Sequence, residues 1–87
     1  IKLNEGEQHE IIKILQHTAK FKNAYEIIKI DGLRVEYEHG FGLMRASNTT
    51  PSIVLRFEAD SNKNLELIQN EFKEVLKSYI SYEKIPF

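Results

Sequence analysis

Residues 31–58 contain two regular alternations of apolar and polar side chains, and this pattern restricts the fold more than any other feature. Leu33, Val35 and Tyr37 alternate with charged residues, and Ile53, Leu55 and Phe57 alternate with Val54, Arg56 and Glu58. Because successive side chains of a β-strand point to opposite faces, each run predicts a strand with one buried face and one wet face. Strands of this kind are typical of antiparallel sheets that are covered on one side.

Short polar segments separate these runs and predict hairpins. Asp31-Gly32 is a two-residue hairpin signal, because both residues tolerate positive φ, and it follows the β-branched and aromatic run Tyr25–Ile30. His39-Gly40 is expected to turn the chain into a third strand over Phe41–Ala46, and residues 47–51 form the loop before the fourth. The sequence therefore predicts four strands linked as hairpins.

Helices are expected on both sides of the strands. Glu7–Lys20 has helical spacing of its apolar residues, with Gln16 on the solvated side, and Asp60 or Ser61 can cap a second helix. The simplest packing is an α+β domain of two layers, in which both helices cover one face of a four-stranded antiparallel sheet. The residues expected to face the sheet are Ile11, Ile14, Leu15 and Thr18, extended by Ile12 and Ala19, in the first helix, and Leu65, Ile68, Phe72, Val75, Leu76 and Tyr79 in the second.

Length, charge and cysteine content narrow the function classes. The 87 residues suit a single domain. The chain has no cysteine, which excludes disulfides and thiolate metal sites, and its 12 basic and 13 acidic residues do not predict a nucleic-acid partner. No apolar run approaches the roughly 18 residues of a membrane span and no signal peptide is evident, so we expect a cytoplasmic protein without a membrane partner. The start at Ile1, without an initiator methionine, suggests a piece of a longer protein.

No group of residues predicts a catalytic or metal site. His9 and His17 are eight residues apart, whereas a metal-binding pair on a helix is three or four apart. Ser47 has no base nearby in the sequence. The carboxylates that alternate along the strands are expected to face solvent.

The loop after the third strand is the main candidate for ligand binding. Arg45 offers a planar fork of donors, Ser47 and Thr49 offer hydroxyls, and Asn48 offers an amide, with no carboxylate among them. Such a set suits a phosphate oxyanion. The same residue types also form ordinary turns, so the residues alone leave both interpretations open.

Three consecutive segments, Asp31–Tyr37, Gly40–Pro51 and Ile53–Asp60, together resemble the C-terminal domain of the α-D-phosphohexomutases. The resemblance is strongest to the bacterial phosphomannomutase/phosphoglucomutase branch, because the loop reads Arg-x-Ser-Asn-Thr rather than Arg-x-Ser-Gly-Thr. The closing residues Ile85–Phe87 resemble the same branch.

The resemblance implies a fold like that of the TATA-binding protein and a role as the fourth domain, spanning residues 1–87, of a longer enzyme. That enzyme would interconvert hexose 1-phosphates and hexose 6-phosphates through a phosphoserine and a bisphosphorylated sugar. Its Mg²⁺ would be bound by another domain, and this fragment would hold no cofactor and be inactive alone. The resemblance assigns the non-reacting phosphate of the substrate to Arg45, Ser47, Asn48 and Thr49.

Two alternatives differ from this interpretation. One is a stand-alone regulatory α+β module that binds a phosphorylated metabolite without catalysis. The other is an RNA-binding α+β domain, whose aromatic strand residues would stack on bases. The first would not be part of a longer enzyme with a phosphoserine loop, and the second would bind RNA in a salt-sensitive manner.

Overall fold

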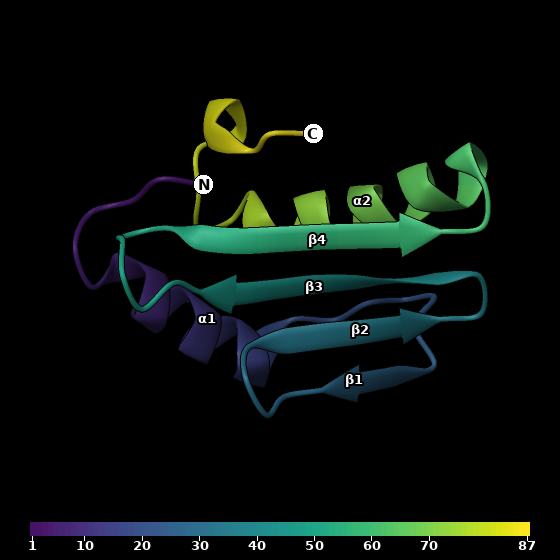
Figure 1. Cartoon of the computed structure of the whole chain (residues 1–87), viewed down its shortest axis with the longest axis horizontal. Coiled ribbons are helices and arrows are strands. Elements are labelled where there is room, and N and C mark those ends of the chain that lie inside the picture. Colours follow the sequence, from purple (N-terminus) through teal and green to yellow (C-terminus); the bar gives the residue numbers. More distant parts are fainter.

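A computed structural model describes all residues from Ile1 to Phe87 and contains two helices packed on a four-stranded sheet (Figure 1). The predicted order of helix, four strands and helix, and the predicted α+β class, are confirmed. No helix is both long and apolar enough to cross a membrane. In chain order the elements are α1 (Glu7–Thr18), β1 (Glu26–Ile28), β2 (Leu33–Tyr37), β3 (Gly40–Ala46), β4 (Ile53–Ala59), α2 (Asn62–Leu76) and a short 3₁₀ helix, η1 (Tyr82–Lys84).

The strands lie in the sheet in chain order, and every neighbouring pair is antiparallel. Met44 of β3 pairs with Leu33 on one side and with Leu55 on the other, so one row of apolar side chains crosses three strands. Leu33 and Met44 are completely buried, together with Val35. The alternation read from the sequence therefore gives the correct face of β2 and β4.

Both helices cover this apolar face, as predicted. Helix α1 contacts β2 and β3, whereas α2 contacts β3 and β4. The opposite face, called here the open face, carries no helix (Figure 1). The shared core consists of Ile11, Ile12, Leu15, Phe21, Leu33, Val35, Tyr37, Met44, Ile53, Ile68, Phe72, Leu76, Ile80 and Ile85.

The buried stripe of α1 differs from the predicted one. Its buried residues are Gln8, Ile11, Ile12 and Leu15, whereas Ile14 is 41% exposed. At 3.6 residues per turn, a stripe centred on these four positions leaves Ile14 on the flank of the helix. Thr18, also predicted to be buried, is exposed, because the helix ends there.

The end of the second stripe was also predicted wrongly. Tyr79 is 43% exposed because α2 ends at Leu76, so the helical spacing does not continue to residue 79. The start of α2 was predicted correctly: the Oγ atom of Ser61 accepts a hydrogen bond from the backbone N–H of Asn64, at 3.2 Å.

The first strand is shorter than predicted. Tyr25 and Ile30 lie outside β1 and are 70% and 93% exposed. β1 ends at Ile28 and β2 begins at Leu33, so a four-residue connection, residues 29–32, takes the place of the two-residue hairpin. Gly32 is nevertheless required there, because its φ is +92° and a Cβ atom would lie 2.4 Å from the carbonyl oxygen of Met44.

The next turn is displaced by one residue from its predicted place. Residues 38 and 39 form it, and Gly40 is already the first residue of β3, paired with Tyr37. At the other end of the sheet, Lys2 forms an isolated bridge with Ser52, so the N-terminal residues extend along the start of β4.

Candidate functional site

The candidate phosphate loop, residues 47–52, joins β3 to β4 at the end of the sheet where the β1–β2 connection also lies (Figure 1). The two loops are neighbours because β2 pairs with β3 in antiparallel register, so β2 begins where β3 ends. A Cβ atom on Gly32 would lie 2.8 Å from the Cβ of Arg45, so the β1–β2 connection packs against the end of β3. Asp31 and Gly32 of this connection line one surface pocket together with Asn48 of the candidate loop.

Arg45 lies within β3 rather than in the loop itself. It pairs with Val54, and its side chain lies on the open face with 46% of its surface exposed. Its nearest carboxylate is Asp31 of the β1–β2 connection, with 3.8 Å between Nη1 and Oδ2. Exposed ion pairs of this length are weak, so the guanidinium remains able to bind an anionic ligand.

Two other arginines on the open face are more firmly engaged. The Nε atom of Arg34 donates to Glu36 at 2.7 Å, and its guanidinium carbon lies 4.1 Å from the centre of the Phe41 ring. Arg56 donates to Glu58 at 2.6 Å. Each of these pairs joins residues two positions apart on one strand, and Arg45 has no such partner.

Ser47 is the centre of the loop's hydrogen bonds. Its Oγ atom accepts from the backbone N–H groups of Thr49 and Thr50, both at 3.3 Å, and from the Thr50 hydroxyl at 3.2 Å. The Thr49 hydroxyl lies 3.3 Å from the same oxygen. The hydroxyl oxygen thus occupies the point on which several donors converge, a local turn motif common for serine.

The structure brings together only part of the predicted set. Ser47, Thr49 and Thr50 are joined by these bonds, and Asn48 is exposed beside them. No hydrogen bond joins the Arg45 guanidinium to the loop; its polar partner is Asp31. The loop residues Asn48, Thr49 and Thr50 instead line a shallow surface pocket with Pro51, Glu5 and Gln8.

Sequence reasoning missed Gln8, which is only 5% exposed. Its Nε2 atom donates to the carbonyl oxygens of Ser47 and Thr50, both at 3.3 Å. It therefore ties the two ends of the loop to α1. The only signal in the sequence is its position, one turn before Ile11 and Ile12 on the buried stripe.

Gln16 makes the same kind of contact with the other connection, although the sequence placed it on the solvated side of the helix. Its Nε2 atom donates to the carbonyl oxygens of Lys29, at 3.1 Å, and Gly32, at 2.9 Å. Helix α1 thus binds both loops at this end of the sheet.

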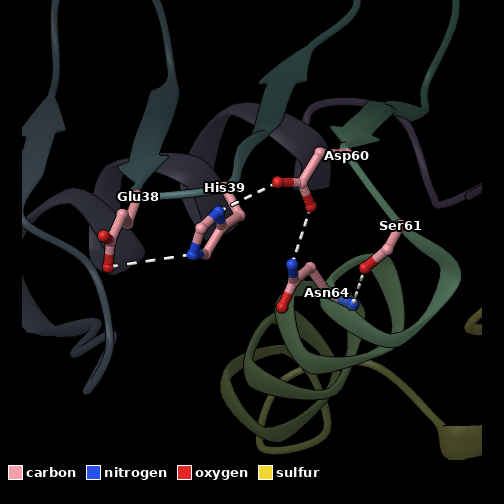
Figure 2. Close-up of polar contacts among 5 residues, drawn as sticks. All are labelled: Glu38, His39, Asp60, Ser61 and Asn64. Carbon is pink, nitrogen blue, oxygen red and sulfur yellow. Dashed lines mark hydrogen bonds and ion pairs between the residues drawn. The ribbon is translucent and has the colours of Figure 1, made fainter.

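A second polar cluster lies at the opposite end of the sheet, where β4 passes into α2 (Figure 2). The Nδ1 atom of His39 is 2.9 Å from Asp60, and the side-chain amide of Asn64 donates to the other Asp60 oxygen at 2.7 Å. The hydrogen bond from Asn64, with a further contribution from His39, lowers the pKa of the Asp60 carboxyl. With Ser61 as the cap, this cluster fixes the start of α2 and is separate from the candidate loop.

Comparisons with known proteins agree on one family. Residues 1–75 match the family described as the phosphoglucomutase/phosphomannomutase C-terminal domain. The chain is 60% identical over 79 residues to a phosphoglucomutase of Neisseria meningitidis serogroup B, covering 90% of this chain and 17% of that protein. It is 45% identical over 87 residues to a phosphomannomutase/phosphoglucomutase of Pseudomonas aeruginosa, covering 100% of this chain and 19% of that protein.

A solved structure agrees with these matches. A phosphoglucomutase/phosphomannomutase family protein of Burkholderia thailandensis superposes with a TM-score of 0.85 at 50% identity, covering 92% of this chain and 18% of that one. The chain thus spans about a fifth of the length of these relatives. It belongs to the phosphoglucomutase/phosphomannomutase family and corresponds to the C-terminal domain of its members.

Proposed function

We propose that this domain binds the non-reacting phosphate of a hexose phosphate, and that it does so as one part of a phosphohexomutase. Arg45, Ser47, Asn48 and Thr49 are the proposed ligands. The observation that carries the proposal is the state of Arg45: it is half-exposed beside a donor-rich loop, and its one carboxylate partner is 3.8 Å away.

The chemistry of the loop supports an anionic ligand. The N–H groups of Thr49 and Thr50 and the Thr50 hydroxyl donate to Ser47 Oγ, so a phosphate oxygen would bind them by replacing Ser47 Oγ as their acceptor. A phosphate oxygen can accept from such donors, and the guanidinium of Arg45 can form two parallel hydrogen bonds to a phosphate.

The whole enzyme, by this proposal, interconverts hexose 1-phosphate and hexose 6-phosphate. A phosphoserine elsewhere in the chain would transfer its phosphoryl group to the sugar, giving a bisphosphate that reorients before the second transfer. We assign the magnesium ion expected of such an enzyme to another part of the longer chain.

The loop would contribute binding energy remote from the reacting atoms. Holding the distal phosphate orients the free hydroxyl toward the phosphoserine, which lowers the entropic part of the barrier. Because the loop recognises a phosphate and not a particular carbon of the sugar, the same site can serve both halves of the reaction. Closure of the domain over the substrate would also keep water from the phosphoserine.

The test is Arg45→Ala in the full-length enzyme, assayed with glucose 1-phosphate and mannose 1-phosphate. A hydrogen bond to a charged group contributes about 1.5–3 kcal/mol, so kcat/KM should fall by about 10- to 100-fold or more. Arg45→Lys should recover only part of the loss, because an ammonium group keeps the charge but not the forked geometry.

Arg34→Ala and Arg56→Ala are the matched controls, since both arginines lie on the same open face but are paired with glutamates of their own strands. Each should cost less activity than Arg45→Ala in an enzyme that is still folded. Equal losses for all three variants would mean that the loop is not a dedicated phosphate site.

A further inference from the structure

The hydrogen bonds of Gln8 connect α1 directly to the candidate loop. One amide nitrogen donates to the carbonyl oxygen of Ser47 and to that of Thr50, which lie on the two sides of Asn48 and Thr49. Gln8 is the one donor that the structure gives to the Ser47 carbonyl, whereas Thr50 also accepts from the Ser52 N–H at 2.8 Å. The separation between the entry and the exit of the loop is therefore set from the helix.

Gln8 is an unfavourable choice if its only task is to pack. It occupies a buried position on the apolar stripe of α1, and its Oε1 atom is buried without a hydrogen-bond partner. An unpaired buried acceptor is costly, whereas an apolar side chain of similar size would fill the same space without that cost. An apolar residue at this position could not make the two hydrogen bonds that Nε2 donates.

The same contact recurs two turns later, which argues against an accident of packing. Gln16 holds the carbonyl oxygens of Lys29 and Gly32 in the neighbouring connection. That connection carries Asp31, the carboxylate nearest to Arg45. Both loops beside the guanidinium are thus fixed to one rigid helix.

We propose that Gln8 is a positioning residue for substrate binding: through Ser47 and Thr50 it holds the candidate loop in the conformation that binds the phosphate. The inference rests on the proposed function of the loop. Gln8 lies at the edge of the pocket lined by the loop but is only 5% exposed, so we assign it no direct contact with the phosphate. Its effect passes through the backbone of Ser47 and Thr50.

The experiment compares Gln8→Met, Gln8→Glu and the parent in the full-length enzyme. Methionine keeps the length and burial of the side chain but loses both donors. We expect kcat/KM for glucose 1-phosphate to fall by about 3- to 10-fold, as for the loss of neutral hydrogen bonds, with the loss mainly in KM. Gln69→Met, the same change at a half-buried position of α2, is the control and should match the parent.

Hydrogen exchange measured by mass spectrometry reports on the loop without any substrate. Peptides that cover residues 45–52 should exchange faster in Gln8→Met, while peptides from β2 and α2 should not change.

Gln8→Glu adds a test in which the pH dependence of activity is measured. A carboxylate beside two carbonyl oxygens cannot donate to either, but its protonated form can donate its single O–H to one of them, and burial favours that form. The activity of Gln8→Glu relative to the parent should therefore rise as the pH falls from about 8 to about 6.

The outcomes separate this inference from the proposed function. If Gln8→Met leaves loop exchange or kcat/KM at parental values, or if the relative activity of Gln8→Glu does not change with pH, the positioning role is wrong, even where Arg45→Ala is strongly impaired. If Arg45→Ala has parental kcat/KM, the phosphate site itself is wrong. Should Gln8→Met fail to fold, the pH profile of Gln8→Glu decides the matter, because each point compares one variant with the parent at the same pH.

Discussion

Gly42 lies directly against the ring of Phe72: a Cβ atom built on Gly42 would be 2.3 Å from Cε1 of that ring. Phe72 is completely buried, and its ring centre lies 4.8 Å from that of Phe21 and 5.0 Å from that of Phe57. The absence of a side chain in the middle of β3 is what lets α2 approach the sheet at this point.

Gly42→Ala should therefore destabilise the domain. Overpacking of a dense core costs about 1–3 kcal/mol, and chemical unfolding of the isolated domain in urea measures this loss. Adding Phe72→Leu to Gly42→Ala should cost less than the sum of the single changes, because the smaller side chain makes room for the methyl group. A change below about 0.5 kcal/mol for Gly42→Ala would contradict the packing described here.

Asp60 should stabilise the fold at neutral pH, and this stabilisation should be lost in acid. Its pKa is lowered from the ordinary 3.8, first by the hydrogen bond from Asn64 and then by His39. A lowered native pKa stabilises the fold above the unfolded value, and this contribution is lost as the pH falls through the native value. Urea midpoints of the parent and Asp60→Asn should differ at about pH 6 and converge below about pH 4. A difference that persists unchanged in acid would rule out this linkage.

Tyr37 should make the stability of the fold depend on pH in alkali. Burial, followed by the hydrogen bond and the charge of Glu71, raises the pKa of Tyr37 above its ordinary 10.0. A raised native pKa gives stability that is complete below the unfolded value and is lost as the pH rises beyond it. The parent should therefore lose stability above about pH 10, and Tyr37→Phe should lose less over the same range.

At neutral pH, Tyr37→Phe should cost about 1 kcal/mol, because the hydroxyl donates to Glu71 at 2.9 Å. Glu71 keeps its contacts with the backbone N–H and the side chain of Asn23, so the carboxylate is not left without donors. Tyr79→Phe, at a partly exposed position, is the control and should show neither effect.

Ser47→Ala tests the loop itself. The change removes the acceptor of three hydrogen bonds from Thr49 and Thr50 but leaves the charge of Arg45 in place. In the full-length enzyme we expect kcat/KM to fall by about 3- to 10-fold, less than for Arg45→Ala, because neutral hydrogen bonds are weaker than charged ones. A loss larger than that of Arg45→Ala would reverse the proposed order of importance.

The isolated domain should bind substrate weakly and show no mutase activity. One loop supplies only part of a site, and the entropy lost on association must still be overcome, so we expect a Kd in the millimolar range or weaker for glucose 1-phosphate. Amide shifts in an NMR titration should concentrate at Arg45–Thr50. Shifts centred on β1 or α2, or turnover above a mock preparation, would contradict this prediction.

Patterns that depend on local geometry were predictable from the sequence. The alternation in β2 and β4 gave their buried faces, and the serine before α2 gave its cap. The donor-rich composition of the Ser47–Pro51 segment also marked the loop. Each of these signals lies within a few residues of the structure that it predicts.

Features set by distant contacts were not predictable in this way. A stripe counted from apolar residues alone included Ile14 and omitted Gln8, because the partners of Gln8 are 39 and 42 residues away in the chain. The distance between Arg45 and Asp31 likewise depends on how two connections meet at the end of the sheet. The length of β1 depends on its register with β2 and not on its own β-propensity.

The arrangement of the four strands in chain order has a consequence for folding kinetics. Each strand pairs with the next across a short connection, so closing any one pair loses little chain entropy. Sheets built from such local pairings fold faster than those that must first join distant segments. The long-range step is the docking of α1 and α2 on the sheet. One helix precedes all the strands in the chain and the other follows them, yet both contribute to one core. We therefore expect the β2–β3–β4 meander to form early and the docking of the two helices to limit the folding rate.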